Sequence, residues 1–200
     1  MFLLPILSIW LVSTILGWIA FPLLYRIFTG LKDRGYAVAR IVALILVTYL
    51  AWMASSLKLL PFTTASVGLA AAVLALISFL SVRKIKSDFV TFLKKKRRMI
   101  FIMEVVFLLS LCIFLYIVSL NPNIDPDTER FMDYALLNGI DQTAYFPPLD
   151  PWFAGKTMNY YYYGYIITSA FHKLTAIGLP LFFNLALALI YALFVLACFG

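Results

Sequence analysis

Two carboxylates lie four residues apart in the most polar stretch of the chain. Residues 121–165 hold six of the nine Asp and Glu residues of the sequence, and Glu129 and Asp133 are among them. At this spacing a helix presents both carboxylates on one face, where they repel each other slightly. Such a pair can hold a divalent cation or supply a general base. It is equally typical of a solvated face in a first helical turn, where acids are favoured.

A run of tyrosines follows this acidic stretch. Residues 160–163 are all tyrosines, and Gly164 and Tyr165 come next. An aromatic belt at the lipid headgroups needs fewer tyrosines per helix, and on a helix these rings would point all around it. Tyrosine rings and hydroxyls could also stack on a sugar and hydrogen-bond to it. The run therefore predicts either a membrane belt or the wall of a ligand site.

Most of the chain outside this stretch is apolar. The sequence is 64% hydrophobic and 12% charged, whereas soluble domains carry about 25% charged residues. Several apolar blocks approach or exceed the roughly 20 residues that a helix needs to cross a bilayer. We therefore predict an all-α fold, a polytopic transmembrane helical bundle. The candidate spans are residues 2–25, 41–57, 62–82, 99–120, 158–173 and 179–200.

Basic residues are concentrated in two of the connections. Four lie within residues 26–40 and eight within residues 83–98. Basic loops stay on the cytoplasmic side and attract anionic headgroups. The sequence thus predicts a multi-pass protein of the cell membrane, with the N-terminus and loop 121–157 external. Its net charge of +7 comes without a nucleic-acid-binding motif, so we expect the lipid bilayer as its partner and no nucleic acid.

The external loop should carry a helix of its own. Thr128, or alternatively Asp127, is a suitable N-cap, and apolar residues then recur at helical spacing up to Gly139 and Ile140. This pattern predicts an amphipathic helix on the membrane surface. Asn and Asp residues alternate just before it, in a pattern that echoes a calcium loop. Two prolines and the missing central glycine argue against such a site.

Four other residues have types that could do chemistry. Glu104 lies inside an apolar span, and its nearness to the basic residues 94–98 favours snorkelling or local pairing. His172, the only histidine, is expected at the inner interface beside Lys173, because no second ligand accompanies it. The two cysteines show no metal-ligand spacing and are predicted to be small buried apolar residues. They are Cys112 and Cys198.

Around the tyrosine run the sequence resembles the YYY membrane protein family (Chlor_Arch_YYY), whose members are large and very hydrophobic. The tyrosine-triplet-x-glycine signature of that family matches residues 160–164. Three further motifs match in order, over residues 129–133, 145–148 and 150–155. The resemblance covers about residues 120–180. Family members are much longer, so we expect this chain to be the front part of a longer protein.

The same segment is similar in plan to the polytopic GT-C glycosyltransferases. Those enzymes place an acid in their first large external loop, beside a membrane-surface helix, and use polyprenyl-phosphate-linked sugars, often with a divalent metal. In this chain the loop follows the fourth predicted span. The likeness therefore implies an N-terminal three-span region over residues 1–98 and an incomplete GT-C-like region over residues 99–200.

This likeness implies roles for individual residues. Asp133, with Glu129 second, would be the base or would hold a divalent cation (Mg or Mn). The implied substrate-binding residues are Asp150, Trp152, Asn159, Tyr160, Tyr161, Tyr162 and Tyr163. The expected function is a membrane-embedded glycosyltransferase that uses a polyprenyl-phosphate-linked sugar at the outer membrane face. A transporter or lipid-handling protein is the alternative and would have broken helices and charges at mid-bilayer depth. A non-catalytic membrane scaffold is the third hypothesis.

Overall fold

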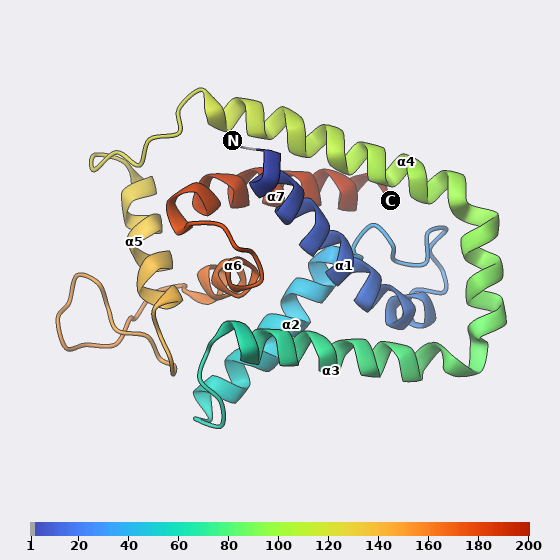
Figure 1. Ribbon diagram of the computed structural model, residues 1–200, viewed down its shortest axis with the longest axis horizontal. Helices are drawn as coiled ribbons and strands as arrows, with labels where there is room; N and C mark the ends of the chain where they lie inside the picture. Colours follow the sequence, from blue (N-terminus) through green and yellow to red (C-terminus); the bar gives the residue numbers. More distant parts are fainter. Residues whose placement is uncertain (1–2) are drawn as a thin grey trace.

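The computed structural model describes residues 3–200, and this part of the chain is built from helices (Figure 1). The predicted all-α, polytopic helical fold is confirmed. The helices are α1 (Leu3–Ile27), α2 (Ala39–Ser56), α3 (Thr64–Val82), a 3-10 turn (Arg83–Ile85), α4 (Lys86–Ser119), α5 (Glu129–Asp141), α6 (Tyr163–Lys173) and α7 (Leu179–Phe199).

Within residues 3–200, four helical segments are long and apolar enough to cross a membrane. They are Leu3–Ile27, Ala39–Ser56, Thr64–Ser119 and Leu179–Phe199. The third contains α3 and α4, which run in opposite directions and therefore supply two crossings (Figure 1). Between them the chain turns through the basic segment 83–98. We call this side of the bundle the basic end and the opposite side the α5 end.

Helix α6 is not a crossing, and the fifth predicted span is wrong. It has 11 residues, which makes it about 16 Å long at 1.5 Å per residue. It is seen almost end-on in Figure 1, whereas α7 lies across the view. Its last residues, His172 and Lys173, contact Asp141 at the end of α5. They therefore lie at the α5 end and not at the opposite side of the membrane.

The turn between α2 and α3 also lies at the α5 end. The Phe62 amide donates to the Ala144 carbonyl oxygen at 2.7 Å, and the Lys173 ammonium lies 5.2 Å from the centre of the Phe62 ring. The chain returns through α7 to the basic end, where Gly200 lies beside Ala37. Within residues 3–200 the path therefore fits five crossings, whereas the sequence predicted six.

The outward face of the spanning helices is apolar, and both cysteines lie on it. Cys112 and Cys198 are exposed on this face, so the prediction that they are buried is wrong. In a bilayer, lipid tails are as apolar as a protein core, so a small apolar side chain is not driven inward.

The acid inside α4 has a partner from a distant helix. Arg40 Nη2 donates to both carboxylate oxygens of Glu104, at 2.8 and 2.7 Å, and the Tyr36 hydroxyl donates to the same carboxylate at 2.5 Å. Arg40 is buried within α2, although the sequence placed it in a basic loop. The predicted pairing of Glu104 with residues 94–98 is therefore wrong, because a buried cation on α2 compensates its charge.

The Arg40 side chain also explains a glycine on α1. A Cβ atom added at Gly17 would lie 2.8 Å from Cγ of Arg40. Because this atom belongs to the buried stem of the side chain, only glycine leaves room for it. The ion pair thus fixes how closely α1 and α2 approach, as well as joining α2 to α4.

We predict that Arg40→Met lowers the free energy of unfolding by about 3 kcal/mol, because it leaves the Glu104 carboxylate without its partner among apolar helices. Thermal unfolding of the purified protein in detergent measures this. Adding Glu104→Leu should restore most of the loss, since no unpaired charge then remains. Lys95→Met, at an exposed basic position of α4, is the control. Equal losses for Arg40→Met and Lys95→Met would show that the ion pair does not stabilise the fold.

Candidate functional site

Helix α5 begins where the sequence predicts and is amphipathic. Its first residue is Glu129, and Leu136, Leu137 and Ile140 are buried. Thr128 occupies the N-cap position, but its hydroxyl donates to the Asp125 carbonyl oxygen and does not cap α5. The helix lies beside α6 and the start of α7 (Figure 1). This placement holds one face of α5 against the bundle and brings its acids Asp133 and Asp141 against α6.

Asp133 is bonded to the tyrosine that follows the Tyr160–Gly164 run. The Tyr165 hydroxyl donates to Oδ1 of Asp133 at 2.5 Å. Burial raises the pKa of Tyr165, and the neighbouring Asp133 carboxylate raises it further. Tyr165 therefore stays a protonated donor at neutral pH. This bond is the direct link between the acidic helix and the tyrosine segment.

Glu129 and Asp133 do not share a set of contacts. Glu129 is exposed at the start of α5, one turn before the half-buried Asp133. Within residues 3–200 no three His, Cys, Asp or Glu side chains gather as ligands for a metal ion. Two carboxylates supply hard oxygen ligands of the kind that Mg²⁺ takes together with several waters. The Mg or Mn site therefore stays a prediction that rests on these two residues.

Asp150 shapes its own loop. Its Oδ1 accepts the backbone amides of Trp152 and Phe153, at 2.8 and 3.0 Å. The loop is closed by bonds from the Asp150 amide to the Lys156 carbonyl oxygen and from the Met158 amide to that of Pro148, both 2.9 Å. The turn presents Trp152 and Phe153 to the surface, 53% and 66% exposed.

The tyrosine run lies mostly before a helix and not within one. Helix α6 starts at Tyr163, so the expectation that the rings point around a helix is wrong. Tyr163 packs edge-on against Trp52 of α2, with ring centres 5.6 Å apart, and Tyr161 is 91% exposed. Four tyrosines, Trp52 and Gly164 line a space of about 380 Å³. We call this space the tyrosine cleft. Asn159, just before it, is exposed.

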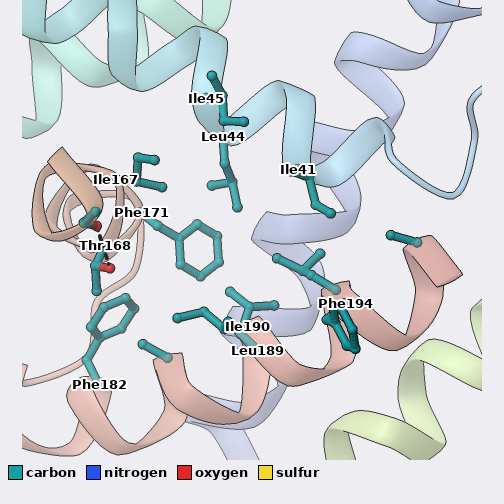
Figure 2. Close-up of a pocket in the computed structure, with 14 residues that line it drawn as sticks. Ile41, Leu44, Ile45, Ile167, Thr168, Phe171, Phe182, Leu189, Ile190 and Phe194 are labelled. Atoms are coloured by element: carbon teal, nitrogen blue, oxygen red, sulfur yellow. Dashed lines mark hydrogen bonds between the residues drawn. The ribbon is translucent and has the colours of Figure 1, made fainter.

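A second space of about 380 Å³ opens between α2, α6 and α7 (Figure 2). We call it the apolar groove, because its lining is almost wholly aliphatic and aromatic, with Phe171, Leu189 and Phe194 among the side chains drawn. The single hydroxyl, of Thr168, donates to the Gly164 carbonyl oxygen at 3.0 Å. Gly164 lines both the apolar groove and the tyrosine cleft. The two spaces therefore meet at this glycine.

The strongest polar cluster at the α5 end was not predicted. Oδ1 of Asp141 accepts the Ser169 hydroxyl at 2.6 Å and faces Nδ1 of His172 at 3.0 Å. Lys173 donates to the Asp141 carbonyl oxygen at 2.6 Å. The spacing of Ser169, His172 and Lys173 places them on one face of a helix, and this spacing could have indicated a polar cluster from the sequence. Their partner is 28 or more residues away in sequence. Spacing within α6 could not identify it.

The surroundings of His172 in this cluster favour its charged form. Its second nitrogen, Nε2, lies 2.9 Å from the Ile177 carbonyl oxygen, so both ring nitrogens face acceptors. Burial acts to lower the pKa of His172, but the bonds to Asp141 and Ile177 outweigh it and raise the value. Burial likewise acts to raise the pKa of Asp141, and hydrogen bonds from His172 and Ser169 lower it overall. Ser169 bonds to Asp141 and not to His172, so these residues do not form a serine nucleophile with its base.

These pKa shifts predict how the α5–α6 contact depends on pH. The His172 contribution is complete below its ordinary value of 6.5 and is lost as pH rises through the raised value. The Asp141 contribution is complete above its ordinary value of 3.8 and is lost as pH falls through the lowered value. The protection factors of α6 amides in hydrogen exchange, which are corrected for the intrinsic pH dependence of exchange, should therefore be highest in the interval between.

The variant His172→Asn should remove the loss of protection at alkaline pH, because its side chain cannot titrate there. Ser169→Ala is the matched control, since it removes a neutral donor, costs about 1 kcal/mol and should leave the alkaline change in place. An alkaline change of the same size in His172→Asn would assign the effect to another group.

Comparison with known proteins was made for the whole chain. No curated protein and no solved structure matches it. Residues 46–200 match a family described as "Uncharacterized membrane protein (DUF2298)". The match starts inside α2 and includes α5, the tyrosine run and α7, so it extends beyond residues 120–180. It supports a membrane protein family, as the sequence resemblance implied, but carries neither the YYY name nor the GT-C likeness. Because this match covers well over half of the sequence, the chain belongs to the DUF2298 family of uncharacterized membrane proteins.

Proposed function

We propose that this membrane protein is a glycosyltransferase that takes its sugar from a polyprenyl-phosphate carrier at the α5 end, the side predicted to be external. One observation carries the proposal: the apolar groove and the tyrosine cleft meet at Gly164. A lipid-linked sugar needs both an apolar channel for its chain and a polar, aromatic space for its sugar, and it needs them in continuity.

The apolar groove suits a hydrocarbon chain. Its one hydroxyl is already bonded within α6, so no polar group of the lining is left without a partner when the groove is filled. Filling it gains van der Waals contact with aromatic and branched side chains, which is the main source of packing energy within a membrane. The tyrosine cleft supplies ring faces and hydroxyls of the kind that bind sugars.

We assign the role of proton acceptor to Asp133, which lines neither the groove nor the cleft but contacts α6 beside both. Its bond to Tyr165 brings it next to the residue that follows Gly164. In the proposed reaction an acceptor hydroxyl gives its proton to the Asp133 carboxylate, and its oxygen forms a bond to the anomeric carbon of the sugar. The bond from that carbon to the carrier phosphate breaks, and the phosphate leaves with the bonding electrons. Alternatively, Asp133 with Glu129 would hold a divalent cation, which would offset the phosphate charge.

A lipid-handling protein without chemistry is the second candidate, because the apolar groove by itself needs only a lipid. Wild-type protein that binds polyprenyl phosphate through the groove but transfers no sugar would favour this second function.

We expect Asp133→Asn to lower sugar transfer by at least about 100-fold, since a general base contributes on that order, while binding of the carrier is retained. The assay is transfer from a radiolabelled polyprenyl-phosphate sugar by the purified full-length protein. Asp127→Asn changes an exposed acid of the same loop and should have wild-type activity. Unchanged transfer in Asp133→Asn would remove this residue from the mechanism.

Two substitutions at Gly164 distinguish an effect on carrier binding in the groove from an effect on folding. No atom lies within 4 Å of a Cβ added at this position, and the residue is helical. Gly164→Ala should therefore fold and bind carrier normally, because alanine is the better helix former. Gly164→Leu should weaken binding of undecaprenyl phosphate by about tenfold, since its branched side chain fills the junction. Binding is measured with tritiated undecaprenyl phosphate, and equal affinity of the two variants would mean that the carrier does not pass this glycine.

A further inference from the structure

A third cavity lies at the α5 end, between α1, α4 and α7, and has no role in the proposed transfer. Its volume is about 460 Å³, and it shares no lining residue with the apolar groove or the tyrosine cleft. Most of its wall is aliphatic, with Ile6 from α1, Leu115 from α4 and Leu185 from α7. Its polar members lie where α4 ends and α7 begins. They are Tyr116, Ser119 and Asn184.

Asn184 connects this cavity to a positive charge. Its side-chain oxygen accepts a hydrogen bond from Nη2 of Arg130, and its Nδ2 donates to the Pro122 carbonyl oxygen at 2.9 Å. Nη1 of Arg130 donates to the Asn121 carbonyl oxygen at 2.7 Å. All acceptors of the guanidinium are thus neutral oxygens. Among residues 3–200, no carboxylate oxygen lies within 4.0 Å of the Arg130 nitrogens.

The guanidinium also retains donors that the protein does not use. Nε of Arg130 is buried and has no hydrogen-bond partner, and each terminal nitrogen carries a second N–H. Guanidinium groups bind phosphate with parallel N–H bonds. Asn184, which lines the apolar cavity, is thus bonded to a cation that lacks a carboxylate partner and has donors that the protein does not use.

We propose that this cavity binds a glycerophospholipid of the leaflet at the α5 end, with one acyl chain inside and the phosphodiester on Arg130. The bilayer around the spanning helices supplies this combination, because each phospholipid joins an acyl chain to a phosphodiester near the depth where helices end. The lipid would lie against α4 and α7 where Arg130 joins them. The proposal does not depend on the glycosyltransferase function.

The test uses full-length protein in liposomes that contain phosphatidylglycerol with a photoactivatable acyl chain. Irradiation and peptide mapping should place the label on α1, α4 and α7 residues of the cavity. Leu115→Trp fills the cavity and should lower this labelling by about tenfold. Ile117→Trp is the matched control, because Ile117 is an exposed residue of the same helix that does not line the cavity. Its labelling should equal that of the wild type.

Two further arms test the role of Arg130. Arg130→Gln should lower labelling by about tenfold, as expected for a lost charge-assisted bond to phosphate, whereas Arg130→Lys should retain most of it. If Arg130→Gln does not fold, a diacylglycerol probe in wild-type protein replaces it. Without a phosphodiester, this probe should label the cavity about tenfold less than phosphatidylglycerol does.

Three results would overturn the proposal. The first is equal labelling of Leu115→Trp and Ile117→Trp. The second is equal labelling by diacylglycerol and phosphatidylglycerol, which would leave a cavity that takes any chain. The third is displacement by undecaprenyl phosphate at a lower concentration than by unlabelled phosphatidylglycerol, which would assign the cavity to the carrier.

Discussion

Asp141 holds the last turn of α6 through Ser169, His172 and Lys173. Because of these bonds α6 stays at the α5 end and lies against α2 and α7 instead of crossing the membrane. The apolar groove has α6 as one wall, and the tyrosine cleft is formed where α6 begins. Both spaces, and the bond from Tyr165 to Asp133, therefore depend on a contact between two short helices that lie between α4 and α7 in the chain.

Two arginines join distant parts of the chain beside α4, and they act differently. Near the basic end, Arg40 pairs with a carboxylate inside the spanning part of α4. At the α5 end, Arg130 bonds to neutral oxygens beside the end of α4 and the start of α7. The first arrangement neutralises a charge among apolar helices and is structural. The second leaves a guanidinium without a carboxylate partner, and this is the group that the proposed phospholipid would bind.

The sequence predicted α5 well and α6 poorly, for a physical reason. In α5, apolar residues recur at helical spacing after Thr128, and Glu129 is the first helical residue, as expected. Met158–Lys173 is apolar enough to resemble a short span, but its first five residues precede the helix. Asn159 and the tyrosines need not be buried in lipid, since their polar groups can remain at the interface. Hydropathy alone could not separate this segment from a crossing.

The sequence indicated most residues of the candidate site, whereas only the structure showed which of them contact each other. By itself the sequence determined a polytopic helical membrane protein, the amphipathic α5 and the concentration of acids and tyrosines in one loop, because these follow from local composition and periodicity. Only the tertiary structure decided that Tyr165 bonds to Asp133, that Glu104 pairs with Arg40 and that His172 faces Asp141. Each of these pairs joins residues more than 30 positions apart. Such contacts depend on how helices pack, and spacing along a single helix carries no information about them.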